Sequence, residues 1–199
     1  MALPSHIQEI FFDTMLGDKP VAEFEQWVYS EESLERILSL EDYLDLISYG
    51  YKGEPVIRHG LYRMLEKMID LAAFEKYRLL KMMRRALLRD ERFPFILREI
   101  YDLYCRGYSF LDNIGLGYGL SIEAPQYADS WEELTEEEKQ KVLANMRTGL
   151  DDEVKKVIYW LESGLAVPTG KRDVYDHYEY IDNRSGKEKE PTGYKVHRL

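Results

Sequence analysis

Cysteine is almost absent from this chain of 199 residues, since Cys105 is the only one. A single thiol excludes an internal disulfide and a zinc site built on several cysteines. Because Cys105 falls in an apolar helical pattern, we expect it to be a small buried hydrophobe. Long hydrophobic runs are missing too: no uncharged stretch approaches the ~18–20 residues of a membrane-spanning helix. The first residues lack the basic start of a signal peptide, so we expect a cytoplasmic location.

Motifs that would indicate catalysis are also missing. The four histidines form no i, i+4 pair. His177 lies in an Asp-His-Tyr-Glu run, but neighbours on a strand point to opposite faces, so we expect it to be solvated or hydrogen-bonded. The glycines of Gly-Leu-Gly-Tyr-Gly, residues 115–119, lack the Lys-Ser/Thr of a phosphate-binding loop and either end a short helix or allow close backbone packing. We therefore predict no catalytic residue, no metal and no cofactor, and a protein that is not an enzyme.

Positive charge is scarce in the first fifty residues, which hold two cations, Lys19 and Arg36, against eleven carboxylates. The whole chain has a net charge of −10, which disfavours binding to nucleic acid through its phosphates. The cations of the middle third gather on the solvent side of a predicted helix over 72–89. We expect this basic face to pair with the acidic first third, within the chain or between subunits.

Helical periodicity dominates the rest of the sequence. Apolar residues recur at helical spacing, and the pattern predicts helices over 5–17, 40–49, 54–70, 72–89, 94–104, 136–147 and 151–165, with two shorter ones between 20 and 38. Thr135 and Glu138 predict a capping box. The predicted fold class is all-α, an irregular multi-helix bundle or array with a small C-terminal β-hairpin or extended tail. We expect a helical domain over 1–169 and an extended segment over 170–199, in which residues 174–181 pair with 194–199 or form a tail.

The acids of residues 23–45 are the best candidates for a functional surface. Acids elsewhere sit at predicted helix starts, where the helix dipole favours them, but here they occur throughout the helices and lie beside tyrosines, which are enriched at interfaces. Two explanations of this pattern stay open, a solvated acidic face and a surface that contacts a protein partner. The candidate partner-binding residues are Glu23, Tyr29, Glu31, Glu32, Glu35, Glu41, Asp42, Tyr43 and Asp45.

The stretch from Phe24 to Lys52 has the pattern F-E-x-W-x-Y, an acidic L-E, D-x-Y-L-x-L-I-S and Y-K. It resembles a segment of small bacterial proteins that are similar to the immunity proteins of polymorphic or contact-dependent toxin systems. The resemblance implies a protein without catalytic residues that binds and neutralises a cognate toxin, and an acidic inhibitor suits a basic toxin. It covers about one seventh of the chain.

Two other classes of function stay open. One is a helical scaffold or adaptor in a multi-protein complex, which would show a long concave groove. The other is a helical-bundle enzyme, which would bring at least three acidic or histidine side chains together in one pocket. Whether the chain is a monomer or a homodimer is undecided from the sequence.

Overall fold

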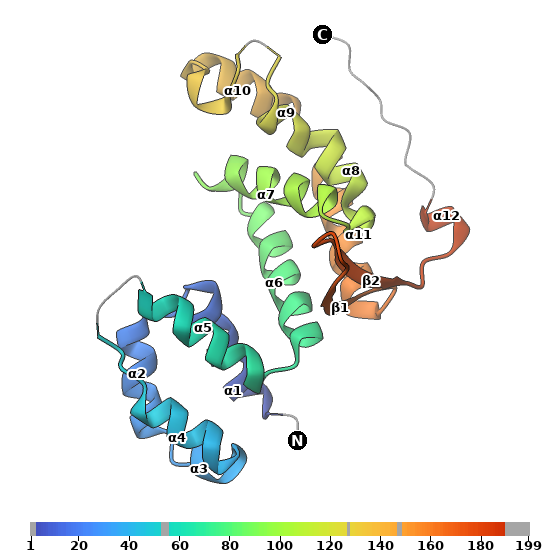
Figure 1. The fold of residues 1–199 in the computed structure, drawn as a ribbon. Coiled ribbons are helices and arrows are strands. Elements are labelled where there is room, and N and C mark those ends of the chain that lie inside the picture. The colour runs from blue at the N-terminus through green and yellow to red at the C-terminus, as the bar shows by residue number, and fades with distance from the viewer. Residues whose placement is uncertain (1–2, 53–55, 127, 147–148, 190–199) are drawn as a thin grey trace. The chain divides into compact units, whose positions relative to one another are not determined.

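The described part of the chain is mostly helical and has one small antiparallel hairpin, followed by a short helix, near its C-terminal end (Figure 1). The computed structural model describes residues 3–52, 56–126, 128–146 and 149–189. The all-α prediction with a small C-terminal hairpin is confirmed. No helix in the described ranges is long and apolar enough to cross a membrane.

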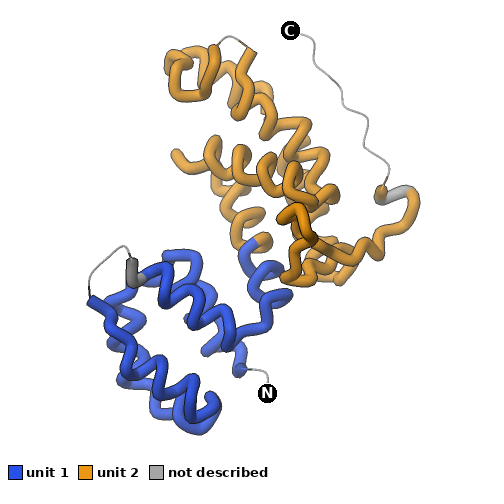
Figure 2. The backbone as a smooth tube through the Cα atoms, viewed as in Figure 1, with its two compact units in different colours: residues 1–78 blue, residues 79–199 orange. Residues whose placement is uncertain are grey.

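The chain divides into two compact units, residues 1–78 and 79–199 (Figure 2). The predicted helical domain over 1–169 thus comprises the first unit and most of the second. The described part of the predicted extended segment, residues 170–189, belongs to the second unit. Helix α6 (Leu71–Ala86) begins in the first unit and ends in the second.

The first unit buries an aromatic core between short helices. Phe11 of α1 (Ser5–Leu16) meets Phe24 of α2 (Val21–Ser30) edge to face, with ring centroids 5.8 Å apart. Phe24 also contacts Trp27 and Tyr51. Such edge-to-face pairs add to the free energy of burying the rings. Besides the start of α6, the unit contains α1 (Ser5–Leu16), α2 (Val21–Ser30), α3 (Leu34–Ile37), α4 (Leu40–Ser48) and α5 (Val56–Met68).

The second unit is built around α7. Its buried side chains include Ile96, Leu97 and Ile100, and they pack with buried residues of α6 and α11. Thr135 and Glu138 form the predicted capping box at the start of α10. The elements of this unit are α7 (Phe93–Cys105), α8 (Asp112–Ile114), α9 (Leu120–Glu123), α10 (Glu136–Asn145), α11 (Leu150–Ser163), β1 (Ala166–Arg172), β2 (Tyr178–Asp182) and α12 (Gly186–Lys189), with short 3₁₀ turns at Ser109–Leu111 and Trp131–Glu133.

The glycine-spaced segment packs closely against α7. Gly115–Gly119 forms a π-helical turn that joins α8 to α9. A β-carbon on Gly119 would lie 2.5 Å from the carbonyl oxygen of Leu97 and 2.9 Å from Cβ of Tyr101. Of the two roles that the sequence leaves open for these glycines, the structure shows close backbone packing.

The hairpin pairs different residues from those predicted. β1 and β2 are antiparallel, with Ala166 opposite Asp182 and Arg172 opposite Tyr178. The predicted strand over 174–181 is wrong at its start, because residues 173–177 form the turn, and its predicted partner, residues 194–199, lies outside the described residues. The observed partner contains Pro168, which a strand at the edge of a sheet tolerates.

Aromatic stacking and arginine contacts join the hairpin to the end of α7. Tyr178 stacks on Tyr108 with centroids 4.8 Å apart, and its backbone N–H donates to the carbonyl of Arg106 at 2.7 Å. In the turn, the carboxylate of Asp176 accepts hydrogen bonds from Arg106 at 2.6 Å and from Arg172 at 2.7 Å.

One sequence prediction in the second unit is corrected. Cys105 is exposed rather than buried, because the buried face of α7 passes through Ile100 and Leu103, and Cys105 lies two residues further round the helix. Of the predicted basic helix face, Arg84 pairs with Glu162 at 2.8 Å, and Arg89, which lies beyond the end of α6, pairs with Asp151 at 2.5 Å. The pairing of this face with the acidic first third stays a prediction.

Candidate partner-binding surface

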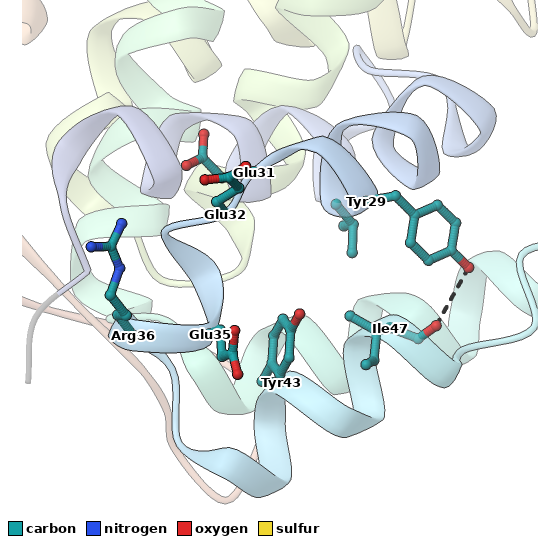
Figure 3. A pocket seen from close by; sticks show the side chains of 8 residues that line it. Tyr29, Glu31, Glu32, Glu35, Arg36, Tyr43 and Ile47 are labelled. Atoms are coloured by element: carbon teal, nitrogen blue, oxygen red, sulfur yellow. Dashed lines mark hydrogen bonds between the residues drawn. The ribbon is translucent and has the colours of Figure 1, made fainter.

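A solvent-open hollow of about 650 Å³ lies in the first unit, between the end of α2, helix α3 and helix α4 (Figure 3). Three elements form its wall, because the chain turns sharply after α2 and again before α4. Its lining consists of Val28, Tyr29, Glu31, Glu32, Glu35, Arg36, Tyr43 and Ile47.

The hollow contains five of the nine residues predicted from the sequence: Tyr29, Glu31, Glu32, Glu35 and Tyr43. The other four, Glu23, Glu41, Asp42 and Asp45, do not line it. Glu41 and Asp45 are exposed on α4, as Glu23 is in the first turn of α2. Asp42 is partly explained by helix capping, because its N–H donates to the Ser39 side chain at 3.1 Å and its carboxylate accepts from the Ser39 hydroxyl at 2.6 Å.

Local hydrogen bonds fix the two ends of the hollow. At one end the hydroxyl of Tyr29 donates to the carbonyl of Ile47 at 3.4 Å, although the side chain is 60 % exposed. At the other end the carboxylate of Glu31 accepts from the Ser33 hydroxyl at 2.5 Å. This bond, the Ser33 backbone N–H and the charge of His6 lower the pKa of Glu31, so the carboxylate is charged at neutral pH.

Tyr51 is buried and packs against Tyr29 of the hollow. Its hydroxyl donates to the carbonyl of Leu46 at 2.7 Å, and its ring meets Tyr29 edge to face at 6.4 Å. Desolvation, followed by the neighbouring Tyr29 and Glu25, raises the pKa of Tyr51 well above its usual 10.0. Tyr51 therefore supports the ring of Tyr29 without adding charge to the surface.

Some carboxylates form ion pairs within the chain and others do not; in the first unit Glu75 pairs with Arg78 at 2.7 Å. In the second unit Asp90, Asp151, Glu132 and Glu162 each pair with an arginine. Among the described residues, no cation forms an ion pair with any of five exposed acids of the first unit, namely Glu23, Glu32, Glu35, Glu41 and Asp45. These five charges are therefore left for solvent or for a partner.

Sequence reasoning missed three residues of the lining. The sequence predicts core positions for Val28 and Ile47, and the structure shows that both also line the hollow. Arg36 follows Glu32 at i, i+4, a spacing that favours an ion pair, yet no ion pair of the described chain involves Arg36. That spacing was the signal that could have placed Arg36 beside the acids.

A second hollow, of about 870 Å³, lies in the second unit between the start of α7, the Trp131 turn and α10. Its apolar lining includes Phe93, Trp131 and Phe95, of which Phe95 is 52 % exposed. Its acids are mostly paired within the chain, as Glu136 is with Lys139 at 3.0 Å. Within the described ranges, no group of three or more His, Cys, Asp and Glu side chains could hold a metal ion.

Comparisons of the chain with protein-family models, with curated proteins and with solved structures give no match.

Proposed function

We propose that this chain is a toxin-neutralising immunity protein of the bacterial cytoplasm, which binds a cognate basic toxin stoichiometrically and occludes its working surface. The proposal includes no catalytic step. The observation that carries it is a hollow lined by Tyr29, Tyr43 and two exposed acids, Glu32 and Glu35, which form no ion pair among the described residues.

Electrostatics support a basic partner. Glu31, Glu32 and Glu35 outnumber Arg36 in the hollow, and Glu41 and Asp45 extend the negative surface along α4. An acidic surface of this kind accelerates association with a cationic protein and repels anionic ones. Tyr29 and Tyr43 supply large contact areas at little cost in conformational entropy, as anchors of protein interfaces do.

The test is a capture experiment from the host, with the neighbouring open reading frames sequenced. We expect the tagged chain to capture a basic protein encoded next to it, in a one-to-one complex, and co-expression to abolish that protein's toxicity. Recovery of no basic partner, together with no toxin gene in the neighbourhood, would refute the proposal.

A matched pair of variants tests the surface once a partner is captured. Glu32→Gln with Glu35→Gln removes two unpaired charges from the hollow, and we expect about tenfold weaker binding, mostly through slower association. Glu137→Gln with Glu162→Gln removes two charges that pair with Lys141 and Arg84, and we expect less than about a twofold change. Equal effects would mean that net charge, rather than this hollow, determines the affinity.

A second candidate function is an adaptor in a multi-protein complex. The observation that favours it is the second hollow, whose exposed Phe95 gives the second unit a separate, more apolar surface. An adaptor would hold two different proteins at once, so light scattering would detect a ternary complex. An immunity protein would give a complex with one partner only.

A further inference from the structure

Helix α4 carries an apolar strip that continues out of the hollow. Leu40, Tyr43, Leu44 and Ile47 follow the spacing i, i+3, i+4 and i+7, which places them on one face of the helix. Tyr43 and Ile47 line the hollow, whereas Leu40 and Leu44 are 72 % and 49 % exposed. Leu46, on another side of α4, is fully buried and fixes the helix to its unit.

Acids border this strip on two sides. Glu41 and Asp45 lie on α4 itself, about 100° round the helix from Leu40 and Leu44. On the far side of the hollow, Glu31, Glu32 and Glu35 come from the end of α2 and from α3, as Figure 3 shows. The surface is therefore an apolar band between two negative margins.

We infer that this band binds an amphipathic helical segment of the protein partner, with an apolar face bordered on both sides by lysine and arginine. The inference rests on the proposed function and specifies the chemistry of its partner. Charge complementarity selects the occupant: the two margins attract cations on both edges of an apolar helix face and repel acidic segments or phosphate groups. A purely polar segment would leave Leu40 and Leu44 in water.

The length of α4 sets the size of the contact. Nine residues span about 13 Å at 1.5 Å per residue, which matches two to three turns of a partner helix. Anchors at i, i+3 or i+4, and i+7 on that helix would face Leu40, Leu44 and the mouth of the hollow. Lysine or arginine on either side would then reach Glu41 and Asp45 on one margin and Glu32 and Glu35 on the other.

Three synthetic helical peptides of about 18 residues test this, long enough for helix formation. The first has leucines on one face bordered by lysine and arginine, the second has the same composition with the leucines dispersed, and the third has glutamate in place of every cation. Fluorescence anisotropy at physiological salt measures binding to the whole chain. We expect the first peptide to bind at least about tenfold more tightly than the second, and the third not to bind.

One double substitution and one single-substitution control locate the site. Leu40→Ala with Leu44→Ala should weaken binding of the first peptide by about tenfold, since both contacts are lost. The control is Leu88→Ala, because Leu88 is also 72 % exposed but lies in the second unit, and we expect less than a twofold change. Circular dichroism should show unchanged helicity in all variants, because the substituted side chains are exposed.

Three results would overturn the inference. Equal affinity of the first peptide and the dispersed peptide would show that charge alone determines binding. Unchanged binding to the Leu40/Leu44 variant would place the contact elsewhere. A wild-type dimer that this variant dissociates would make a second copy of the chain the occupant.

Different experimental results would contradict the inference and the proposed function. A captured toxin that binds the Leu40/Leu44 variant at full affinity would overturn the inference and leave the proposed function standing. Selective peptide binding without any toxin partner would support the band and refute the immunity function.

Discussion

Substitution of Gly119 by alanine tests the close packing of the π-helical turn on α7. The new β-carbon would lie 2.5 Å from the carbonyl oxygen of Leu97 and 2.9 Å from Cβ of Tyr101. The first distance is roughly 1 Å short of ordinary van der Waals contact. The obstacle is backbone, which cannot rotate aside as a flexible side chain does, so the two segments must separate.

The size of the effect follows from two opposing contributions. Overpacking of a buried site costs about 1–3 kcal/mol, and a backbone obstacle places this site in the upper part of that range. Alanine in a helix gains about 1 kcal/mol over glycine. We therefore expect Gly119→Ala to lower the free energy of unfolding by about 1–2 kcal/mol.

Gly117→Ala is the matched control. Gly117 belongs to the same turn and is exposed, so the substitution should gain helix propensity and stabilise by about 1 kcal/mol. The two variants should thus differ by about 2–3 kcal/mol, or about 5–10 °C in melting temperature.

Urea unfolding followed by circular dichroism measures the difference, and amide hydrogen exchange of α7 assigns it to the second unit. If Gly119→Ala proves as stable as Gly117→Ala, then the turn does not pack as tightly as the distances indicate, and the reasoning is refuted.

Three further predictions concern the cap, the hairpin and the tyrosine core. Thr135→Ala removes the capping box of α10 and should lower the free energy of unfolding by about 1 kcal/mol, whereas Ser121→Ala, at an exposed site of α9, should change the urea midpoint little. Arg172 and Arg106 hold the pKa of Asp176 below its usual 3.8, so its contribution is complete above that pH and is lost as the pH falls through the lower folded value. The melting temperature should accordingly fall less steeply with decreasing pH in Asp176→Asn than in the wild type. An equal slope would contradict the ion-pair assignment. Burial raises the pKa of Tyr51 above 10.0, so its contribution to stability is present below pH 10 and is lost as the pH rises through the higher folded value. Spectrophotometric titration should show exposed tyrosines ionising first. The substitution Tyr51→Phe should leave the transition of those exposed tyrosines unchanged.

Local chemistry made much of the fold predictable from the sequence. The capping box of Thr135 and Glu138 places the start of α10 correctly, because its bonds lie within four residues. Apolar periodicity places α1 and α11 within a few residues of their observed bounds. The glycines of 115–119 left a helix end and close packing open, because the choice between them and the π-helical geometry depend on where α7 lies.

Features that depend on distant neighbours were not predictable in the same way. Cys105 sits in an apolar helix, but whether it is buried depends on which face the rest of the unit covers. The strand partner of Tyr178–Asp182 contains Pro168, and the proline reads locally as a helix terminator. Arg89 and Asp151 are far apart in the chain, so their pairing follows from the fold alone.

The candidate surface was predicted in its composition and less well in its shape. The acids and tyrosines of residues 23–45 follow from charge and residue type. The hollow depends on the two turns that flank α3, and these turns divide the nine predicted residues into five inside and four outside. In the sequence Asp42 resembles its acidic neighbours, but in the structure its hydrogen bonds with Ser39 make it part of a helix cap.

Helix α6 has a consequence for how the two units melt. Phe74, near its start, belongs to the core of the first unit, while Leu79, Met82 and Met83 belong to the core of the second. The boundary between Arg78 and Leu79 therefore falls inside continuous helix, where a chain break would leave four N–H and four C=O groups without helical partners. Unwinding that spreads along α6 from either unit would remove packing from the core of the other, so we expect the two units to unfold cooperatively.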